Sequence, residues 1–185
     1  MIGPWPSPPP FTADARAALW LDGGLESAVA AYMLDRAGLT WLALLPAGAP
    51  EEAMAIAAAL GAPTVTLPVA GPLPRLSAWA AASEAAAAEG ARWLVTGLSE
   101  SPGEPPLPLR LLAVETAIRA HGLEGVYAPL LGYTPIEVGR LALALGVPFE
   151  RTRDCRASCG ECEACRRRAL TFHHLGMVDP AAPNS

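Results

Sequence analysis

The chain has 185 residues, a length that fits one α/β domain with an appendage, and its formal net charge is -5. Hydrophobic residues make up 52% and charged residues 17% of the chain, a composition that argues against intrinsic disorder. All 13 basic residues are arginines, which excludes mechanisms that need a lysine, such as a Schiff base or a Walker-type phosphate lysine. The acidic balance also provides no general basic surface for nucleic acid or for an anionic membrane.

The first 14 residues are rich in proline around Trp5 and Phe11, and we expect them to form an extended arm lying on a surface. The opening residues lack the charged and apolar regions of a signal peptide. No apolar run reaches the roughly 18 residues that a membrane-spanning helix needs. The sequence therefore predicts a cytoplasmic protein with no membrane partner.

From residue 15 onward, short apolar runs alternate with longer alanine-rich stretches, a pattern typical of βαβ units. Strands are predicted at 16–21, 40–46, 63–69, 92–96 and 126–130. Helices are predicted at 25–37, 50–60, 74–90, 108–121 and 135–145, and most of them end near a glycine. We expect residues 15–150 to form a Rossmann-like α/β domain, a five-stranded parallel sheet with helices on both faces.

Ligands of such a sheet bind at the carboxyl ends of its strands. Two segments are expected at that edge: the turn Asp22-Gly23-Gly24 after the first strand, and the loop 97–106 after the fourth, a candidate lid. Further along, Thr134-Pro135-Ile136-Glu137 predicts a capping box with proline at the first helical position.

Four cysteines close to the C-terminus, Cys155, Cys159, Cys162 and Cys165, have the spacing C-x3-C-x2-C-x2-C. This spacing favours a closed, structural zinc site, with an iron–sulfur cluster or four free thiols as the alternatives. We expect residues 151–185 to form a small zinc-binding lobe that includes a helix from about 163 to 175. The arginines around the cysteines are either a solvated face or a phosphate-binding surface.

The turn Asp22-Gly23-Gly24-Leu25-Glu26-Ser27 resembles the S-G-G-x-D-S turn of the PP-loop ATP pyrophosphatases. A glycine turn between a strand and a helix can present backbone N–H groups to phosphate. A plain helix-capping turn is the alternative reading of the same residues. The resemblance implies the fold of the adenine nucleotide alpha hydrolase-like proteins, with ATP and magnesium bound at residues 21–27.

A second resemblance lies in the tail of the chain. Residues 129–134, the predicted helix that ends at Gly146-Val147-Pro148-Phe149, and Thr152-Arg153-Asp154-Cys155 are similar to one PP-loop branch. The similarity continues through the C-G-x-C-x-x-C run at 159–165 to Asp179-Pro180. That branch is the 7-cyano-7-deazaguanine synthase (QueC/ExsB) family.

The resemblance implies an ATP- and ammonia-dependent enzyme that converts 7-carboxy-7-deazaguanine to the nitrile in queuosine biosynthesis. If active, the chain would be a C–N bond-forming ligase with AMP-type activation, acting on a deazapurine carboxylate or a related acid. The resemblance also implies a homodimer and a structural zinc held by the four cysteines. Nucleotide binding would fall on Leu21, Asp22, Gly23, Gly24, Leu25, Glu26 and Ser27, with Glu26 and Ser27 as the catalytic residues.

The sequence departs from the family pattern at three positions: Asp22 replaces a serine, Glu26 an aspartate and Pro135 a lysine. We expect Asp22 to place a carboxylate at the N-cap of the first helix, where it would compete with phosphate for the same N–H groups. An alternative hypothesis is therefore a degenerate, catalytically inactive paralogue that acts as a zinc-containing binding or scaffold protein. A zinc module that binds RNA through its arginines is a third hypothesis, which the low pI of about 5.2 opposes.

Overall fold

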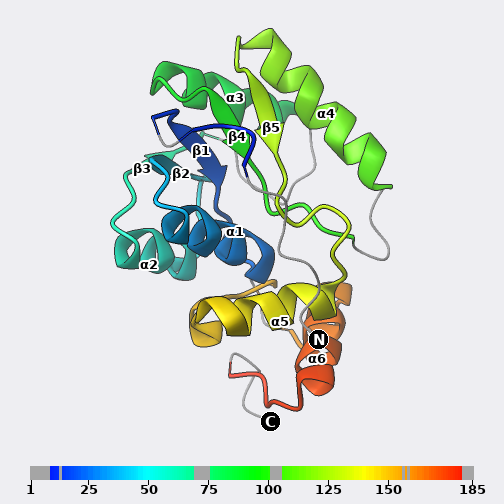
Figure 1. Ribbon diagram of the computed structural model, residues 1–185. Coiled ribbons are helices and arrows are strands. Elements are labelled where there is room, and N and C mark those ends of the chain that lie inside the picture. The colour runs from blue at the N-terminus through cyan, green and yellow to red at the C-terminus, as the bar shows by residue number, and fades with distance from the viewer. Residues whose placement is uncertain are drawn as a thin grey trace.

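The computed structural model describes residues 9–12, 14–68, 76–100, 106–155, 157 and 159–180. Strands alternate with helices along the described chain (Figure 1). The strands are β1 (Ala17–Trp20), β2 (Trp41–Leu45), β3 (Thr64–Thr66), β4 (Trp93–Val95) and β5 (Gly125–Tyr127). The helices are α1 (Leu25–Arg36), α2 (Glu51–Ala59), α3 (Leu76–Ala88), α4 (Leu107–Ala120), α5 (Pro135–Leu145), the short 3-10 helix η1 (Phe149–Arg151) and α6 (Glu163–Leu175).

The sheet has the strand order β3-β2-β1-β4-β5, and every neighbouring pair is parallel. β1 lies at the centre, and all four of its residues are buried, as expected for a strand that is covered on both faces. The chain winds outward from β1 through β2 to β3 and then crosses to β4 on its other side. Such a reversal of strand order creates a crevice at the carboxyl ends of β1 and β4.

Alternate residues of β1 point into two separate hydrophobic cores. Ala17 and Leu19 pack with α1, α2 and α5, whereas Ala18 and Trp20 pack with α3 and α4. Trp79 of α3 is fully buried, and its ring lies 5.7 Å from that of Trp20. Both tryptophans are core residues of the α3–α4 face of the sheet.

The last two helices lie below the carboxyl edge of the sheet, beside α1 (Figure 1). α5 contacts α1 on one side and α6 on the other, so it joins the sheet domain to the C-terminal lobe. The predicted capping box begins α5, since Thr134 Oγ1 accepts from the Glu137 N–H and the Glu137 carboxylate accepts from the Thr134 N–H at 2.8 Å. Gly146 ends the helix in the left-handed conformation.

The predicted fold class is confirmed, and each predicted strand and helix is present with ends that differ by a few residues. In the predicted arm, Phe11 stacks on Trp93 at 5.2 Å and meets Tyr127 edge-on. The remainder of the arm falls mainly outside the described residues, as do positions 101–105 of the candidate lid. The domain boundaries at 14 and 150 stay a prediction. No helix in the described part of the chain is both long and apolar enough to span a bilayer.

Candidate functional site

The turn after β1 lies in the crevice between β1 and β4. Gly23 has φ +89°, and a Cβ there would lie 2.7 Å from the Pro50 ring, so the tight turn requires glycine. Gly97, just after β4, approaches the start of α1 so closely that a Cβ would lie 2.7 Å from the Ser27 nitrogen. Gly23 therefore lets the turn pack against the start of α2, and Gly97 lets the end of β4 pack against the first turn of α1.

Asp22 binds the donors of its own turn. Its Oδ1 accepts from the Gly24 N–H at 3.0 Å and from the Ser27 hydroxyl at 2.7 Å. The N-cap of α1 is Gly24, so the expectation that Asp22 occupies the N-cap is wrong by two residues. The Asp22 carboxylate still competes with a phosphate, because it accepts from the Gly24 N–H at the start of the helix.

A second carboxylate reaches the same helix from the C-terminal lobe. Asp154 Oδ1 accepts from the Leu25 N–H at 2.9 Å, across a separation of 129 residues. The neighbouring Arg153 N–H donates to the Gly23 carbonyl at 2.7 Å. The segment that leads into the first cysteine is thus hydrogen-bonded directly to the glycine turn.

Glu26 completes a group of three carboxylates around Gly24. Its side chain is 18% exposed, and its Oε1 lies 3.8 Å from a guanidinium nitrogen of Arg167. Burial, followed by repulsion from Asp154, raises the pKa of Glu26 to about 7. Burial also raises the pKa of Asp154, against the hydrogen bond from Leu25 and the nearby arginines. Burial and a neighbouring carboxylate therefore favour the protonated form of Glu26 more strongly than Arg167 opposes it.

These contacts decide how well the turn fits a nucleotide phosphate. The glycine geometry and the helix N-terminus suit an anion. The N–H groups of Gly24 and Leu25 are, however, already bound to Asp22 and Asp154. The residues therefore fit a phosphate only in a state in which a carboxylate has moved away.

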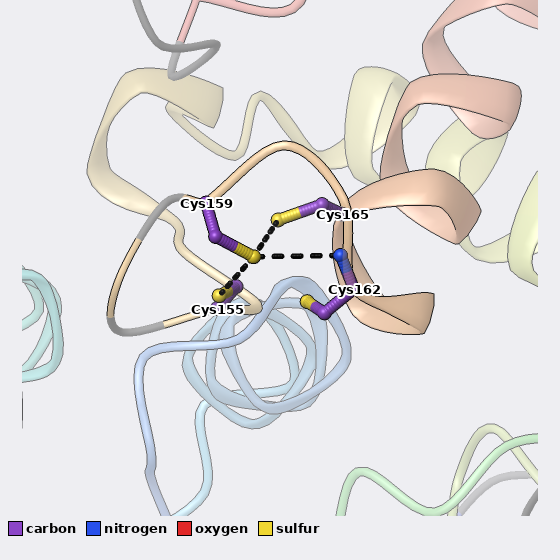
Figure 2. A group of neighbouring side chains, drawn as sticks. All are labelled: Cys155, Cys159, Cys162 and Cys165. Carbon is purple, nitrogen blue, oxygen red and sulfur yellow. Dashed lines mark hydrogen bonds between the residues drawn. The ribbon is translucent and has the colours of Figure 1, made fainter.

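The four cysteines converge on one point (Figure 2). Their sulfur atoms all lie within 4.8 Å of one another, with Cys159 at 3.8 Å from Cys155 and 4.0 Å from Cys165. A tetrahedral zinc ion with Zn–S bonds of about 2.3 Å needs sulfur–sulfur separations of about 3.8 Å. None of the four forms a disulfide. The donor set and its spacing fit a zinc ion without rearrangement of the backbone.

The acidities of these thiols are uneven. Hydrogen bonds from the backbone of Cys159 and from Cys162 lower the pKa of Cys155 to about 6. Burial and the thiol of Cys162 raise the pKa of Cys165 to about 12. Four thiolates this close together repel one another, so a divalent cation is needed before all of them lose their protons.

A buried arginine connects the metal lobe to the turn. Arg168 of α6, 6% exposed, forms a two-point ion pair with Asp179 at 2.8 and 2.9 Å. It also donates to Thr152 Oγ1 at 2.9 Å and to the Phe149 carbonyl, and it lies 3.8 Å from Asp154. Arg168 thereby fixes the position of the segment that carries Asp154.

Comparison with known proteins finds a similarity in the C-terminal part of the chain. The family model of the queuosine biosynthesis protein QueC matches residues 112–176, which run from α4 to the end of α6. A 7-cyano-7-deazaguanine synthase of Persephonella marina is 46% identical over 59 residues, 30% of this chain and 26% of that protein. The enzyme of the same name from Trichodesmium erythraeum is 36% identical over 84 residues, 40% of this chain and 38% of that protein. Residues 112–176 of the chain are thus similar to QueC proteins.

The similarity to QueC proteins is confined to part of the molecule. The matched stretches cover 26% to 38% of these two relatives, and the glycine turn lies outside the family-model match. Among solved structures, a predicted subunit of a tRNA methyltransferase from Methanocaldococcus jannaschii is similar at 13% identity and a TM-score of 0.41, over 75% of this chain and 91% of that one. That likeness is too low to bear on function.

The structure brings together most of the residues that the sequence singled out. The QueC-like lobe, with its four cysteines, lies against the turn at 22–27, whereas His173 and His174 are exposed on α6. Arg110 is buried and donates to the Ser99 carbonyl at 2.6 Å. The sequence did not single out Asp154 as a site residue, because no local pattern shows that a residue beside a cysteine reaches a helix 129 positions earlier.

Proposed function

We propose that this chain catalyses the reaction of the QueC family, the ATP-dependent conversion of a 7-deazapurine carboxylate to its nitrile with ammonia as the nitrogen donor. The observation that carries the proposal is the contact between the QueC-like lobe and the glycine turn, formed by Arg153 and Gly23 at 2.7 Å. It joins the family-specific part of the chain to the crevice in which a sheet of this order binds its ligands.

The residues for each role follow from their positions. Gly23, Gly24 and Ser27 would hold phosphate at the start of α1, and Glu26 would assist the magnesium ion. ATP supplies a leaving group for oxygen atoms that a carboxylate cannot release by itself. The protein contributes positioning and electrostatic stabilisation in a crevice that excludes water. The four cysteines would hold zinc in a structural role, because they leave no coordination position open.

The test is pyrophosphate release by zinc-loaded protein given ATP, magnesium, ammonium and 7-carboxy-7-deazaguanine. Release that depends on the deazapurine acid, with the nitrile found by mass spectrometry, is the expected result. Ser27→Ala should abolish it, whereas Ser83→Ala, a buried serine of α3 on the opposite face of the sheet, should leave it unchanged. An absence of substrate-dependent release in the native protein and the Ser83→Ala variant would contradict the proposal.

A second candidate is a non-catalytic QueC paralogue that retains the fold and the metal lobe as a binding or scaffold protein. The observation that favours it is the pair of carboxylates, Asp22 and Asp154, that accept from the N–H groups of the N-cap Gly24 and of Leu25, the first residue of α1. This candidate predicts no binding of ATP by the native protein, even in the presence of saturating magnesium.

The homodimer that the resemblance implies stays a prediction. Sedimentation equilibrium of the zinc-loaded chain tests it directly, since a dimer doubles the 19.1 kDa mass of the chain. A single species at the monomer mass over a wide concentration range would contradict it.

A further inference from the structure

The carboxylate of Asp154 lies where the first phosphate oxygen of a nucleotide would be expected. It accepts from the Leu25 N–H at 2.9 Å, and its Oδ1 comes within 3.2 Å of the position that a Cβ on Gly24 would occupy. Its side chain is only 7% exposed. A buried anion therefore fills the space over the glycine turn, at the positive end of the α1 dipole.

Asp154 differs from Asp22 in where it comes from. Asp22 belongs to the turn itself, is exposed, and reaches its neighbours across two and five residues. Asp154 belongs to a segment that is distant from the turn in the chain. Arg168 contacts this segment, and the next residue after Asp154 is Cys155. The backbone bond from Arg153 to Gly23 holds that segment against the turn. The backbone that carries this carboxylate is thus fixed against the turn.

A phosphate that entered here would meet Asp154 together with Asp22 and Glu26. Like charges at contact distance in a largely buried site repel strongly. Arg167 lies 3.8 Å from Glu26 and Arg168 lies 3.8 Å from Asp154, but Arg168 is also paired with Asp179. Three carboxylates and a phosphate would therefore outnumber these two cations. Phosphate and Asp154 also need the same N–H donor, so that the two cannot occupy the start of α1 together.

We propose that Asp154 is an internal occupant of the phosphate subsite and determines whether nucleotide phosphates are admitted to it. The inference rests on the proposed function, because it takes the glycine turn to be the phosphate-binding element. A residue that merely caps α1 would add to stability and leave anion affinity unchanged. An internal occupant predicts instead that removal of its charge increases anion affinity.

The experiment compares the binding of inorganic pyrophosphate with magnesium to three zinc-loaded proteins by isothermal titration calorimetry. The variant is Asp154→Asn, which removes the charge and keeps an oxygen that can accept from the Leu25 N–H. The control is Glu52→Gln, which makes the same charge change at the partner of Arg153, 2.8 Å away, without touching α1. Asp154→Ser is the second variant, should the asparagine form fail to fold.

Asp154→Asn is expected to bind pyrophosphate at least about tenfold more tightly than the native protein, which corresponds to about 1.4 kcal/mol. Glu52→Gln is expected to stay within about twofold of the native protein on the same scale. Native and Asp154 variants that bind equally well would overturn the inference while leaving the proposed function in place.

Two further outcomes separate the inference from the proposed function. Tighter pyrophosphate binding by Asp154→Asn with no pyrophosphate release from ATP, in any of the proteins, supports the inference and contradicts the proposed function. No binding by the native protein, Asp154→Asn, or a double variant that also carries Asp22→Ser overturns both, because the turn would then not be an anion site.

Discussion

The glycine turn and the cysteine lobe lie against each other, and their binding groups differ in one respect. In the lobe, four sulfur atoms point toward a common centre at distances that match a tetrahedral metal ion. In the turn, the donors that would hold a phosphate point at carboxylates of the chain itself. The cysteines of the lobe are thus arranged to bind a metal ion from solution, whereas the N–H groups of the turn already donate to carboxylates of the same chain.

The comparison with QueC proteins follows the same division. The matched stretch ends at residue 176 and contains all four cysteines, whereas Asp22 and Glu26 lie outside it. A metal site that supports the local fold is lost only together with that fold. A phosphate-binding turn can change its chemistry and still form its strand and helix, since Asp22 satisfies the helix start as an anion would.

The largest expected effect comes from breaking the lobe. Cys165→Ser removes one of the four metal ligands, and structural zinc contributes an apparent 10–16 kcal/mol in small zinc domains. We expect the bound zinc to fall from about one ion per chain to near zero, and the melting temperature to drop by more than about 10 °C. Elemental analysis and thermal denaturation measure the two quantities.

The matched control is His173→Ala, an exposed position on the same helix whose loss should leave zinc content unchanged. Because Asp154 precedes Cys155, hydrogen exchange at the Leu25 amide should also be faster in Cys165→Ser. Unchanged protection of that amide would show that the turn and the lobe are independent of each other.

The arrangement of strands and helices could be predicted from the sequence because it depends on local patterns. Alternating apolar runs such as 40–46 and alanine-rich stretches such as 50–60 carry their own periodicity. The capping box at Thr134 and Glu137 was equally visible, since both partners lie within one helical turn. The cysteine site was predictable for the same reason.

The link between the turn and the lobe could not be predicted in this way. The contacts of Asp154 with Leu25 and of Arg167 with Glu26 join residues that are far apart in the chain. Their geometry follows from the packing of α5 between α1 and α6, which no local pattern contains. The raised pKa of Glu26 has the same origin, because its causes are burial and the charge of Asp154.

A smaller effect is expected when the arginine between the two regions is removed. Arg168→Met would leave Asp154 and Asp179 buried without their main cation, and breaking such a pair costs about 3–5 kcal/mol. Urea denaturation should show that loss. Arg166→Met, on the exposed side of the same helix, is the control and should change stability by less than about 0.5 kcal/mol. Equal effects in both variants would contradict the buried network.

The charge of the turn can be tested through pH. The pKa of Glu26 is raised from 4.5 to about 7, so the folded protein binds more protons than the unfolded chain between these values, and stability falls as pH rises through that range. Glu26→Gln removes this dependence. We expect the variant to match the native protein near pH 4 and to exceed it by about 3 kcal/mol at pH 8.

The measurement is the free energy of unfolding in urea at a series of pH values. Asp35→Asn, at the far end of α1, provides a carboxylate control on the same helix. Parallel curves for the native protein and Glu26→Gln would mean that the acidic turn contributes no strain to the fold.

The smallest expected effect concerns α5, which joins the two regions. Thr134→Ala removes the side chain that accepts from the Glu137 N–H, and loss of such a cap costs about 1 kcal/mol. Thr116→Ala is the matched control, because the Thr116 hydroxyl only donates to the Leu112 carbonyl within α4 and its loss should change stability by less than about 0.5 kcal/mol. Since α5 packs against both α1 and α6, a fraying start should loosen the turn and the lobe to the same extent. Hydrogen exchange that rises in the lobe alone would instead show that the carboxylates hold the turn without help from α5.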